Sequence, residues 1–308
     1  MVVQNAPVKI TKLSSTDAFV VVDLPNAPVA TGIVRCAKKI LQDGAVNLAR
    51  TQTYTYAAFG MQRSGASAGI NADGEGRDAA VAAFVDELGP RAAAGELVLD
   101  AGKGLAAEEL VAWRVGDLRV VDRADADGST LATGVVAAAH AALGGLGGRT
   151  IIVEEGAVHS ATIASAFTTA GASVSVAPTS DALVSECDVL CVGSKVGLID
   201  HDIAAALRCA LVVPTAALPI TARGLAVAGR AGVRVLADFV TTAAPTLVAW
   251  DNDAADVSAA NGNAFARISE VVTAAAAHPE GDLLGACSLA EEFLRTWCDE
   301  LPFGRPLA

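Results

Sequence analysis

The segment TIIVEEGAVHSATIASAFTTAGASVSVA, residues 150–177, decides the fold. Two short runs rich in β-branched residues, Thr150–Val153 and Val174–Ala177, enclose a stretch with the apolar spacing of a helix, Ser160–Ala170. Gly171 follows that stretch directly, at the position where a glycine commonly ends a helix. Two parallel strands need a long crossover between them, so a strand, a helix and a second strand in this order predict a β-α-β unit. We therefore expect an α/β fold with a parallel sheet.

The same alternation continues along the rest of the chain. Strands are expected at Val189–Val192, Ala210–Val213 and Arg234–Leu236, and helices at Leu131–Leu143, His201–Leu207 and Thr221–Arg230. Such alternation is typical of a doubly wound parallel sheet, so residues 129–255 are expected to form a Rossmann-like domain. Residues 256–308 are expected to add helices near Ala264–Ala277 and Leu289–Glu300 that pack back on the interdomain cleft.

The N-terminal part, residues 1–128, is expected to form a second α/β domain. Its predicted strands are Val8–Leu13, Ala18–Leu24 and Leu97–Leu99, and its predicted helices are Arg35–Gln52, Arg77–Leu88 and Ala106–Arg114. The stretch from Phe59 to Gly76 contains too many small residues for a plain helix. The Asp-rich stretch Asp122–Gly128 indicates a polar connector between the two domains.

Composition excludes several classes of protein. The 308 residues are 53% hydrophobic and 18% charged, which excludes a disordered chain. Their net charge of −12 argues against a nucleic-acid partner, because phosphate binding needs clustered Lys and Arg. No apolar run reaches the roughly 18–20 residues that span a bilayer, and residues 1–10 lack the features of a secretion signal. We expect a cytoplasmic protein with no membrane partner.

The six cysteines, at positions 36, 187, 191, 209, 287 and 298, do not indicate a metal site. Cys187 and Cys191 lie on one predicted strand, and neither a second close pair nor neighbouring histidines complete a zinc site. We expect small buried thiols in a reducing compartment, and no metal.

Five stretches carry motifs that occur together, in the same order, in one family of enzymes. They are Gly32-Ile-Val-Arg35, the segment TYTYAAFGMQRSGASAGI of residues 53–70, Leu99-Asp-Ala-Gly102, the region from Cys187 to Leu218, and Ala237-Asp-Phe-Val240. They resemble Gly-Gly-Thr-Arg, TYKNAAAGL…GGGK, D-V-G/N-T, CDVFAPCA…GAANN and PDFVANAGG of the amino-acid dehydrogenases acting on leucine, phenylalanine, valine and glutamate. The resemblance covers about Val8 to Trp250. It implies an N-terminal substrate and dimerisation domain followed by a nucleotide-binding, Rossmann-like domain.

The resemblance implies two functional lysines, and this chain has neither. The family lysine that holds the substrate carboxylate corresponds to Thr55, and the lysine that transfers protons corresponds to Ser67. All six lysines lie elsewhere, at positions 9, 12, 38, 39, 103 and 195. The family aspartate is retained as Asp100. Oxidative deamination is not expected without an ammonium group tuned to act near neutral pH. A serine replaces that group only with an activating base, so Ser67 is also interpreted as a small residue in a tight loop.

The nucleotide-binding turn is altered as well. A GxGxxG turn lets backbone N–H groups approach a pyrophosphate at a helix N-terminus. The corresponding turn here is degenerate and contains Glu154, Glu155, Ala157, His159 and Ser160. A shift of the alignment by one residue recovers only Gly156. Glu154 and Glu155 add negative charge where phosphates would bind, and two such charges about 5 Å apart repel by roughly 3 kcal/mol. His159 is interpreted as a solvent-facing helix end, with anion binding or acid chemistry as the alternative.

Three further positions of the dinucleotide site have changed. Val176-Ala177-Pro178 lacks the acidic residue that would hold the ribose hydroxyls. The asparagine pair of GAANN corresponds to Ala217-Leu218, and the asparagine of VANAGG corresponds to Thr242. No NAD(P) cofactor is therefore expected.

Polar residues remain on the substrate side. Asp100 and Lys103 are the candidate catalytic residues, a general base or acid beside a cation. The candidate substrate-binding residues are Arg35, Tyr54, Thr55, Arg63 and Ser67. Arg63 is suited to hold a carboxylate through two hydrogen bonds. In the alternative interpretation Asp100 caps the following turn and Lys103 is solvated.

Two of the remaining candidates also have structural interpretations. Arg35 follows an apolar strand, where an internal acid could be its partner. Tyr54 and Tyr56 are two residues apart and cannot share one face of a helix, so we expect one in the core and the other in the cleft.

Three functions fit these observations. The chain could be a repurposed, cofactor-independent enzyme acting on a small amino acid, imine or 2-oxo acid in a biosynthetic pathway. It could be a non-catalytic protein that binds a ligand or a partner, or an atypical NAD(P)-dependent oxidoreductase. A small, anionic substrate is expected in the first interpretation. A homodimer is also expected, because the resembled family associates through its first domain and the strands Val8–Leu13 and Ala18–Leu24 are expected to have exposed, apolar faces.

Overall fold

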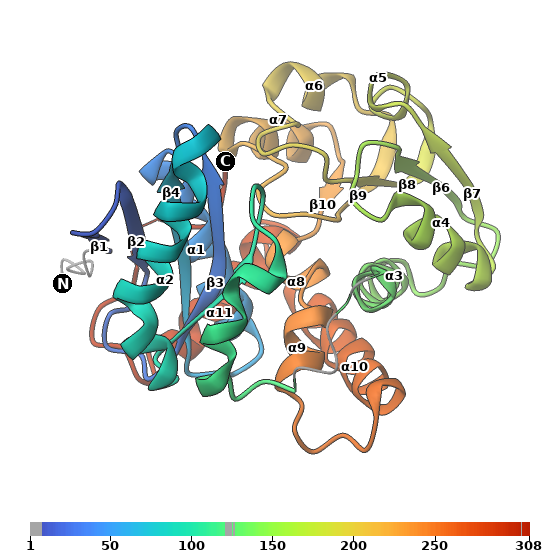
Figure 1. Cartoon of the computed structure of the whole chain (residues 1–308). Helices are drawn as coiled ribbons and strands as arrows, with labels where there is room; N and C mark the ends of the chain where they lie inside the picture. The colour runs from blue at the N-terminus through green and yellow to red at the C-terminus, as the bar shows by residue number, and fades with distance from the viewer. Residues whose placement is uncertain (1–7, 121–124, 126, 303) are drawn as a thin grey trace. The chain divides into compact units, whose positions relative to one another are not determined.

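Two β-sheets with helices packed on them organise the computed structural model (Figure 1). The structure describes residues 8–120, 125, 127–302 and 304–308, and within these residues each sheet has five strands. The chain divides into two compact units. Unit 1 comprises Met1–Leu118 with Ala290–Pro306, and unit 2 comprises Arg119–Leu289 with Leu307–Ala308. The predicted α/β class is confirmed.

Unit 1 contains a mixed sheet with the strand order β1-β2-β4-β3-β5. The strands are β1 (Lys9–Lys12), β2 (Ala18–Val22), β3 (Ala30–Ala37), β4 (Ser64–Asn71) and β5 (Leu97–Ala101). The pairs β1–β2 and β2–β4 are antiparallel, whereas β3 is parallel to both β4 and β5. Strand β3 therefore lies between two parallel neighbours, and side chains from all three strands share each face of the sheet.

Helices cover both faces of the unit 1 sheet. Helix α1 (Gln42–Ala58) packs on the face that carries Phe19 and Val21. Helix α2 (Arg77–Ala93) packs on the other face, together with the 3-10 helix η2 (Ala107–Gly116). A short 3-10 turn, η1 (Gly74–Gly76), precedes α2. The rings of Phe84 and Trp113 stack at 5.3 Å between α2 and η2, so these two elements share one apolar core.

Two predicted helices of unit 1 are corrected by the structure. The predicted helix Arg35–Gln52 begins as the end of strand β3, and the helix itself starts only at Gln42. The predicted helix Ala106–Arg114 is the 3-10 helix η2. The glycine- and serine-rich stretch contains strand β4, so the expectation that it is not a plain helix is confirmed. Small residues in β4 are required by close packing: a Cβ atom on Gly65 would collide with the carbonyl oxygen of Ala49 in α1. Tertiary packing therefore overrides the low strand propensity of this segment.

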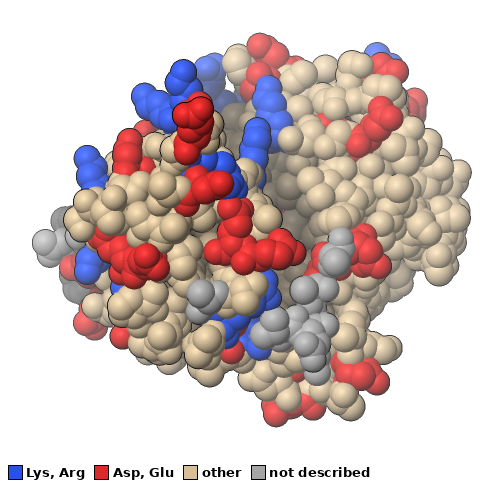
Figure 2. Space-filling view, viewed as in Figure 1, with Lys and Arg blue, Asp and Glu red and all other residues tan. Residues whose placement is uncertain are grey.

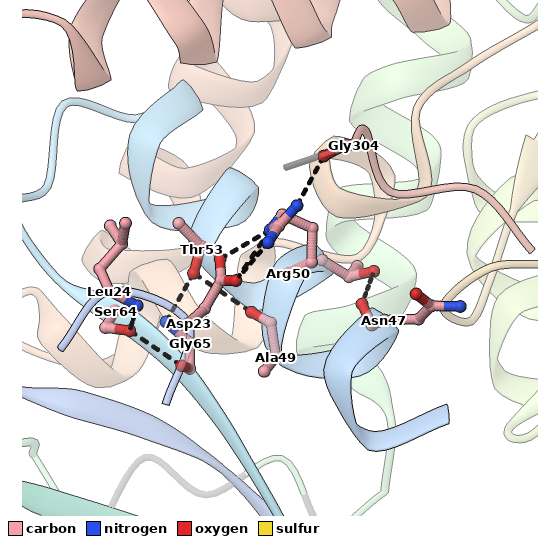
Figure 3. Close-up of polar contacts among 10 residues, drawn as sticks. Asp23, Leu24, Asn47, Ala49, Arg50, Thr53, Ser64, Gly65 and Gly304 are labelled. Carbon is pink, nitrogen blue, oxygen red and sulfur yellow. Dashed lines mark hydrogen bonds and ion pairs between the residues drawn. The ribbon is translucent and has the colours of Figure 1, made fainter. Parts of the chain in front are cut away.

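A buried ion pair joins α1 to the end of β2 (Figure 3). The Nε of Arg50 donates to both carboxylate oxygens of Asp23 at 2.8 and 2.9 Å, and Nη2 lies 2.7 Å from Oδ1. The Nη1 of Arg50 donates to the carbonyl oxygen of Gly304 at 2.7 Å. The Asp23 and Arg50 side chains are 0% and 4% exposed, so loss of either partner leaves an uncompensated buried charge.

Unit 2 contains an all-parallel sheet with the strand order β10-β9-β8-β6-β7. The strands are β6 (Thr150–Glu154), β7 (Ser173–Ala177), β8 (Cys187–Val192), β9 (Cys209–Pro214) and β10 (Arg234–Val235). Helix α3 (Ser129–Leu143) precedes β6, and the helices that connect the strands are α4 (Ser160–Thr169), α5 (Thr179–Ala182), α6 (His201–Ala206) and α7 (Ala222–Arg230). Within this unit α3 and α4 lie on one side of the sheet and α5 to α7 on the other (Figure 1). The predicted Rossmann-like, doubly wound architecture is confirmed.

The chain after β10 forms further helices. They are α8 (Asp238–Thr241), α9 (Ala244–Trp250), α10 (Val257–Ala275) and α11 (Asp282–Leu294). Helices α8 and α9 were not predicted from the sequence, and α10 and α11 begin several residues earlier than predicted. Asp256 caps α10 by accepting a hydrogen bond from the N–H of Ala259 at 2.8 Å, which fixes the early start. Most of the predicted connector Asp122–Gly128 lies outside the described residues.

The expected burial of the cysteines is confirmed for five of the six. Only Cys298 is partly exposed, and all six are free thiols. Burial raises the pKa of Cys187 to about 12 and that of Cys209 to about 11, so these thiols stay protonated. Cys187 and Cys209 are register partners on β8 and β9.

Two surface properties bear on the expected partners. Within the described residues, no helix combines the length and apolar character of a membrane span. On the face drawn in Figure 2, basic and acidic side chains are interspersed, and uncharged atoms cover most of the rest.

Strand β1 is exposed along its whole length, whereas β2 is entirely buried. The predicted exposed face of Ala18–Leu24 is therefore wrong, because β2 lies inside the sheet between β1 and β4.

Candidate functional site

A buried carboxylate lies at the topological switch point of unit 2. Strand β6 has β7 on one side and β8 on the other, and the chain reverses its direction of travel across the sheet between them. Ligands of open α/β sheets bind in this crevice, beyond the carboxyl ends of the strands. Here Glu154 ends β6, and its side chain is fully buried.

The chain itself supplies every donor that holds this carboxylate. Oε2 accepts hydrogen bonds from the backbone N–H groups of Gly193 and Ser194, at 2.9 and 3.1 Å, in the loop after β8. Oε1 accepts from the hydroxyl of Thr179 at 2.7 Å and from the hydroxyl of Ser194. Burial by itself raises the pKa of Glu154, but these hydrogen bonds outweigh it and the pKa lies below its ordinary value. Glu154 is therefore an ionised, internally satisfied group that links the ends of three chain segments.

The rest of the degenerate turn is packed locally. Glu155 is exposed, and its N–H donates to the carbonyl oxygen of Ala177 at 2.8 Å. Ala157 is buried and donates to the carbonyl oxygen of Glu154, and Ser160 donates to that of Ala157. His159 adopts a left-handed conformation with φ of 59°, and its ring fills the space over Gly128. Instead of two exposed like charges, the turn thus carries one exposed and one buried carboxylate.

A second buried carboxylate lies beyond β10. Asp238 is 2% exposed, and its Oδ2 accepts a hydrogen bond from the N–H of Leu218 at 2.7 Å. Burial raises the pKa of Asp238 to about 6. Leu218 is buried and has a φ of 58°, a left-handed conformation that is uncommon for a branched residue. Thr242 donates from its hydroxyl to the carbonyl oxygen of Asp238 at 2.7 Å. The two positions predicted to have lost asparagines, Leu218 and Thr242, thus both bond to Asp238.

In unit 1, the candidate residues Ser67 and Asp100 share one sheet face. Ser67 on β4 and Asp100 on β5 are both register partners of Ile33 on β3. Register partners project to the same side of a sheet, so the three side chains form one row. Arg35 is two residues after Ile33 and lies on the same face, opposite Gly69 of β4.

The polar groups in this row differ in their surroundings. Ser67 is fully buried, and among the described residues its hydroxyl has no hydrogen-bond partner. Ser67 lies in the middle of strand β4, so the prediction that it lies in a tight loop is wrong. Asp100 is half-buried near the end of β5. Lys103 is exposed in the turn that follows, where its carbonyl oxygen accepts the N–H of Cys36 at 2.9 Å.

Arg35 is half-buried and extends along the same face. Its Cγ lies 3.0 Å from the position that a Cβ atom on Gly102 would take, so the side-chain stem passes over this glycine. The Nε and Nη2 atoms are buried, and among the described residues neither has a hydrogen-bond partner. Burial lowers the pKa of Arg35. The internal acid that was expected as an alternative partner does not reach these two nitrogens in the described part of the chain.

The α1 candidates are directed into unit 1. Tyr54 is buried, and its hydroxyl donates to Oε1 of Glu291 at 3.1 Å. Tyr56 is equally buried and is hydrogen bonded to the hydroxyl of Thr31, so both tyrosines belong to the core and the expectation that only one of them does is wrong. Thr55 donates to a main-chain carbonyl of its own helix, that of residue 51, at 3.2 Å.

Arg63 lies immediately before β4 and is half-buried, and burial lowers the pKa of its guanidinium.

Three of the residues predicted from the sequence share a sheet face, namely Arg35, Ser67 and Asp100. The donors around Glu154 were not predicted, although polar residues at the carboxyl ends of parallel strands are a signal that could have found Ser194.

One group of potential metal ligands occurs among the described residues outside these sites. Ligand atoms of Asp200, His201 and Asp202 lie within 4.8 Å of one another. The Asp200 carboxylate caps α6, accepting from the N–H groups of Asp202 and Ile203 at 3.0 and 2.9 Å. The arrangement is that of a helix cap at the surface.

Comparison with known proteins defines the fold. No protein-family model matches the chain, and no curated protein aligns with it. The structure is similar to L-tryptophan dehydrogenase from Nostoc punctiforme, with a TM-score of 0.72 and 14% identity over 95% of this chain and 96% of that one. It is similar to hetero-hexameric glutamate dehydrogenase from Thermus thermophilus, in its Leu-bound form, with a TM-score of 0.77 and 19% identity over 95% and 89%. It is also similar to glutamate dehydrogenase from Peptoniphilus asaccharolyticus, with a TM-score of 0.71 and 14% identity over 95% of this chain and 91% of that one. The predicted amino-acid-dehydrogenase-like fold is confirmed.

Proposed function

We propose that this protein no longer carries out NAD-dependent oxidative deamination and acts without a cofactor on a small amino acid, imine or 2-oxo acid. The observation that carries the proposal is the Glu154 carboxylate at the switch point of unit 2. Two backbone N–H groups that could meet an anionic ligand there donate to Glu154 instead. A bound diphosphate would have to displace or face this buried charge, and neither is favourable.

The proposed acid–base chemistry rests on the residues that stand at the positions of the two family lysines. Thr55 donates to its own helix, and Ser67 is a buried hydroxyl, so neither supplies an ammonium group. Asp100 remains on the sheet face shared with Ser67 and Arg35. A carboxylate that moves a proton, beside cations that orient an anionic substrate, supports cyclisation, condensation or rearrangement of an imine. In this proposal Asp100 is the acid–base group, and Lys103 and Arg63 orient the substrate.

The loss of the cofactor is tested by direct binding. The protein is titrated with NADH and with NADPH, up to about 1 mM, in a calorimeter, beside the Nostoc punctiforme L-tryptophan dehydrogenase as a control. We expect heat of binding only from the control. Micromolar binding by this protein would reject the proposal in favour of an atypical oxidoreductase.

Catalysis is tested by proton exchange. The protein is incubated in D₂O, without cofactor, with a panel of α-amino acids and 2-oxo acids, and loss of the proton signals next to the carboxylate or carbonyl carbon is followed by NMR. We expect exchange of at least one compound, and its slowing by about 100-fold or more in Asp100→Asn. Exchange that is unchanged in this variant removes Asp100 from its assigned role. Binding without exchange favours a non-catalytic binding protein.

A further inference from the structure

Arg35 has an unusual environment for a guanidinium group. Its Nε and Nη2 are buried, and among the described residues neither donates a hydrogen bond. A guanidinium keeps its charge in proteins, so these donors lose hydration without gaining an acceptor. A group of this kind weakens the free protein and is expected where a ligand provides the acceptor.

The same edge of a guanidinium binds carboxylates elsewhere in this protein. Arg234 donates from Nε and Nη2 to the two oxygens of Asp282, at 3.0 and 2.6 Å. Arg305 donates from Nε and Nη2 to the two oxygens of Glu291, at 2.7 and 3.0 Å. Nε and Nη2 therefore form the fork that fits the two oxygens of a carboxylate. Arg35 presents this fork with no carboxylate of the described chain on it.

Glycines flank Arg35 on the two strands that neighbour β3. Gly69 is its register partner on β4, and Gly102 follows β5 on its other side. A Cβ atom on Gly102 would press against the Arg35 stem, at 3.0 Å from Cγ. Two residues back along β3, Ile33 has Ser67 and Asp100 as its register partners. One strand repeat of about 6.6 Å separates Arg35 from this row, which is within the length of a small amino or 2-oxo acid.

We propose that Arg35 binds the carboxylate group of the substrate through Nε and Nη2, above the sheet face that carries Ser67 and Asp100. This inference rests on the proposed function, because it names the residue that recognises the substrate carboxylate at that site. It assigns the bidentate contact to Arg35, whereas Arg63 and Lys103 keep the role of orienting charges.

The test compares wild type, Arg35→Met and Arg91→Met by thermal unfolding. Arg91 is a matched control in the last turn of α2, and its Nε lies 3.8 Å from Glu96. The probes are sodium pyruvate and L-alanine at about 50 mM, with sodium chloride at equal ionic strength and the uncharged lactamide as references. We expect at least one of the two carboxylate probes to raise the Tm of wild type and Arg91→Met by about 2 °C or more, and Arg35→Met not to respond.

A second readout separates ligand binding from a structural role. Arg35→Met removes donors that have no acceptor in the described chain, so its Tm without ligand is expected to be equal to or higher than that of wild type. A lower Tm for Arg35→Met, a retained response to both probes, or no response of wild type to either probe would each overturn the inference. NADH binding by a wild type that responds through Arg35 would instead reject only the proposed loss of the cofactor.

Discussion

Replacement of Glu154 by alanine is expected to destabilise unit 2 strongly. The variant leaves four donors without their acceptor: the N–H groups of Gly193 and Ser194, and the hydroxyls of Thr179 and Ser194. A buried donor without an acceptor costs about 1–3 kcal/mol. Gly193 is buried, whereas Ser194 is exposed and can turn to water. Only part of the full penalty therefore applies, and the expected loss in free energy of unfolding is about 2–4 kcal/mol.

The effect is measured by guanidinium-induced unfolding, followed by circular dichroism at pH 7. Glu154→Gln keeps one acceptor oxygen and the side-chain volume, so it is expected to lose about 1 kcal/mol. Glu155→Ala is the matched control, because Glu155 is adjacent and exposed, and its change should stay within about 0.5 kcal/mol. Glu154→Ala within about 0.5 kcal/mol of wild type would refute the assignment of Glu154 as an internal acceptor.

The pH dependence gives an independent check of the same reasoning. The pKa of Glu154 is lower in the folded protein than its ordinary value of 4.5. The ionised carboxylate therefore contributes stability above about pH 4.5, and this contribution is lost as the pH falls towards the folded pKa. The difference between wild type and Glu154→Gln should thus be largest near neutral pH and shrink in acid. A difference that grows in acid would contradict the lowered pKa.

Three further predictions concern other groups. Asp238 has a raised pKa, so its contribution to stability is present below about pH 4 and is lost as the pH rises through about 6, by about 3 kcal/mol in all. In urea unfolding, the free energy of unfolding of Asp238→Asn should rise relative to that of wild type between pH 4 and 7. Parallel pH profiles of the two proteins would contradict this. Asp23→Asn and Arg50→Met are each expected to lose about 3–5 kcal/mol, and the double variant Asp23→Leu with Arg50→Met much less than the sum. Additive losses in chemical unfolding would show that the two charges are not coupled. The expected homodimer has exposed β1 as its available strand, and a monomeric mass in light scattering at micromolar protein would reject it.

The sequence was sufficient to predict unit 2 because its elements carry local signals. Strands such as Thr150–Val153 are compact β-branched runs, and helices such as α4 end at glycine. The short helices α8 and α9 were missed because they follow β10 at once and contain no long apolar period. A helix of four or seven residues depends on packing rather than on propensity, so its sequence gives little local signal.

Unit 1 was predicted less completely because its central sheet depends on long-range packing. Strand β4 is made largely of glycine, alanine and serine, which seldom indicate a strand. Its small residues are explained only by what lies against them, since Cβ atoms on Gly32 and Gly65 would collide with Ala66 and with α1. The order β4-β3-β5 then brings Ser67 and Asp100 beside Ile33, and no local pattern in the sequence specifies that order.

The surroundings of Glu154 and Arg35 differ in the way that the proposed substrate site in unit 1 requires. The charge of Glu154 is met by four donors of its own chain, so an anion arriving there gains nothing that the protein does not already have. The Nε and Nη2 donors of Arg35 have no acceptor among the described residues, so a carboxylate arriving there recovers hydrogen bonds that the free protein lacks. Binding free energy is the difference between these two states, and it favours unit 1. Substitutions at the two positions should consequently differ in their effect on the unliganded protein, with loss of stability at Glu154 and no loss at Arg35.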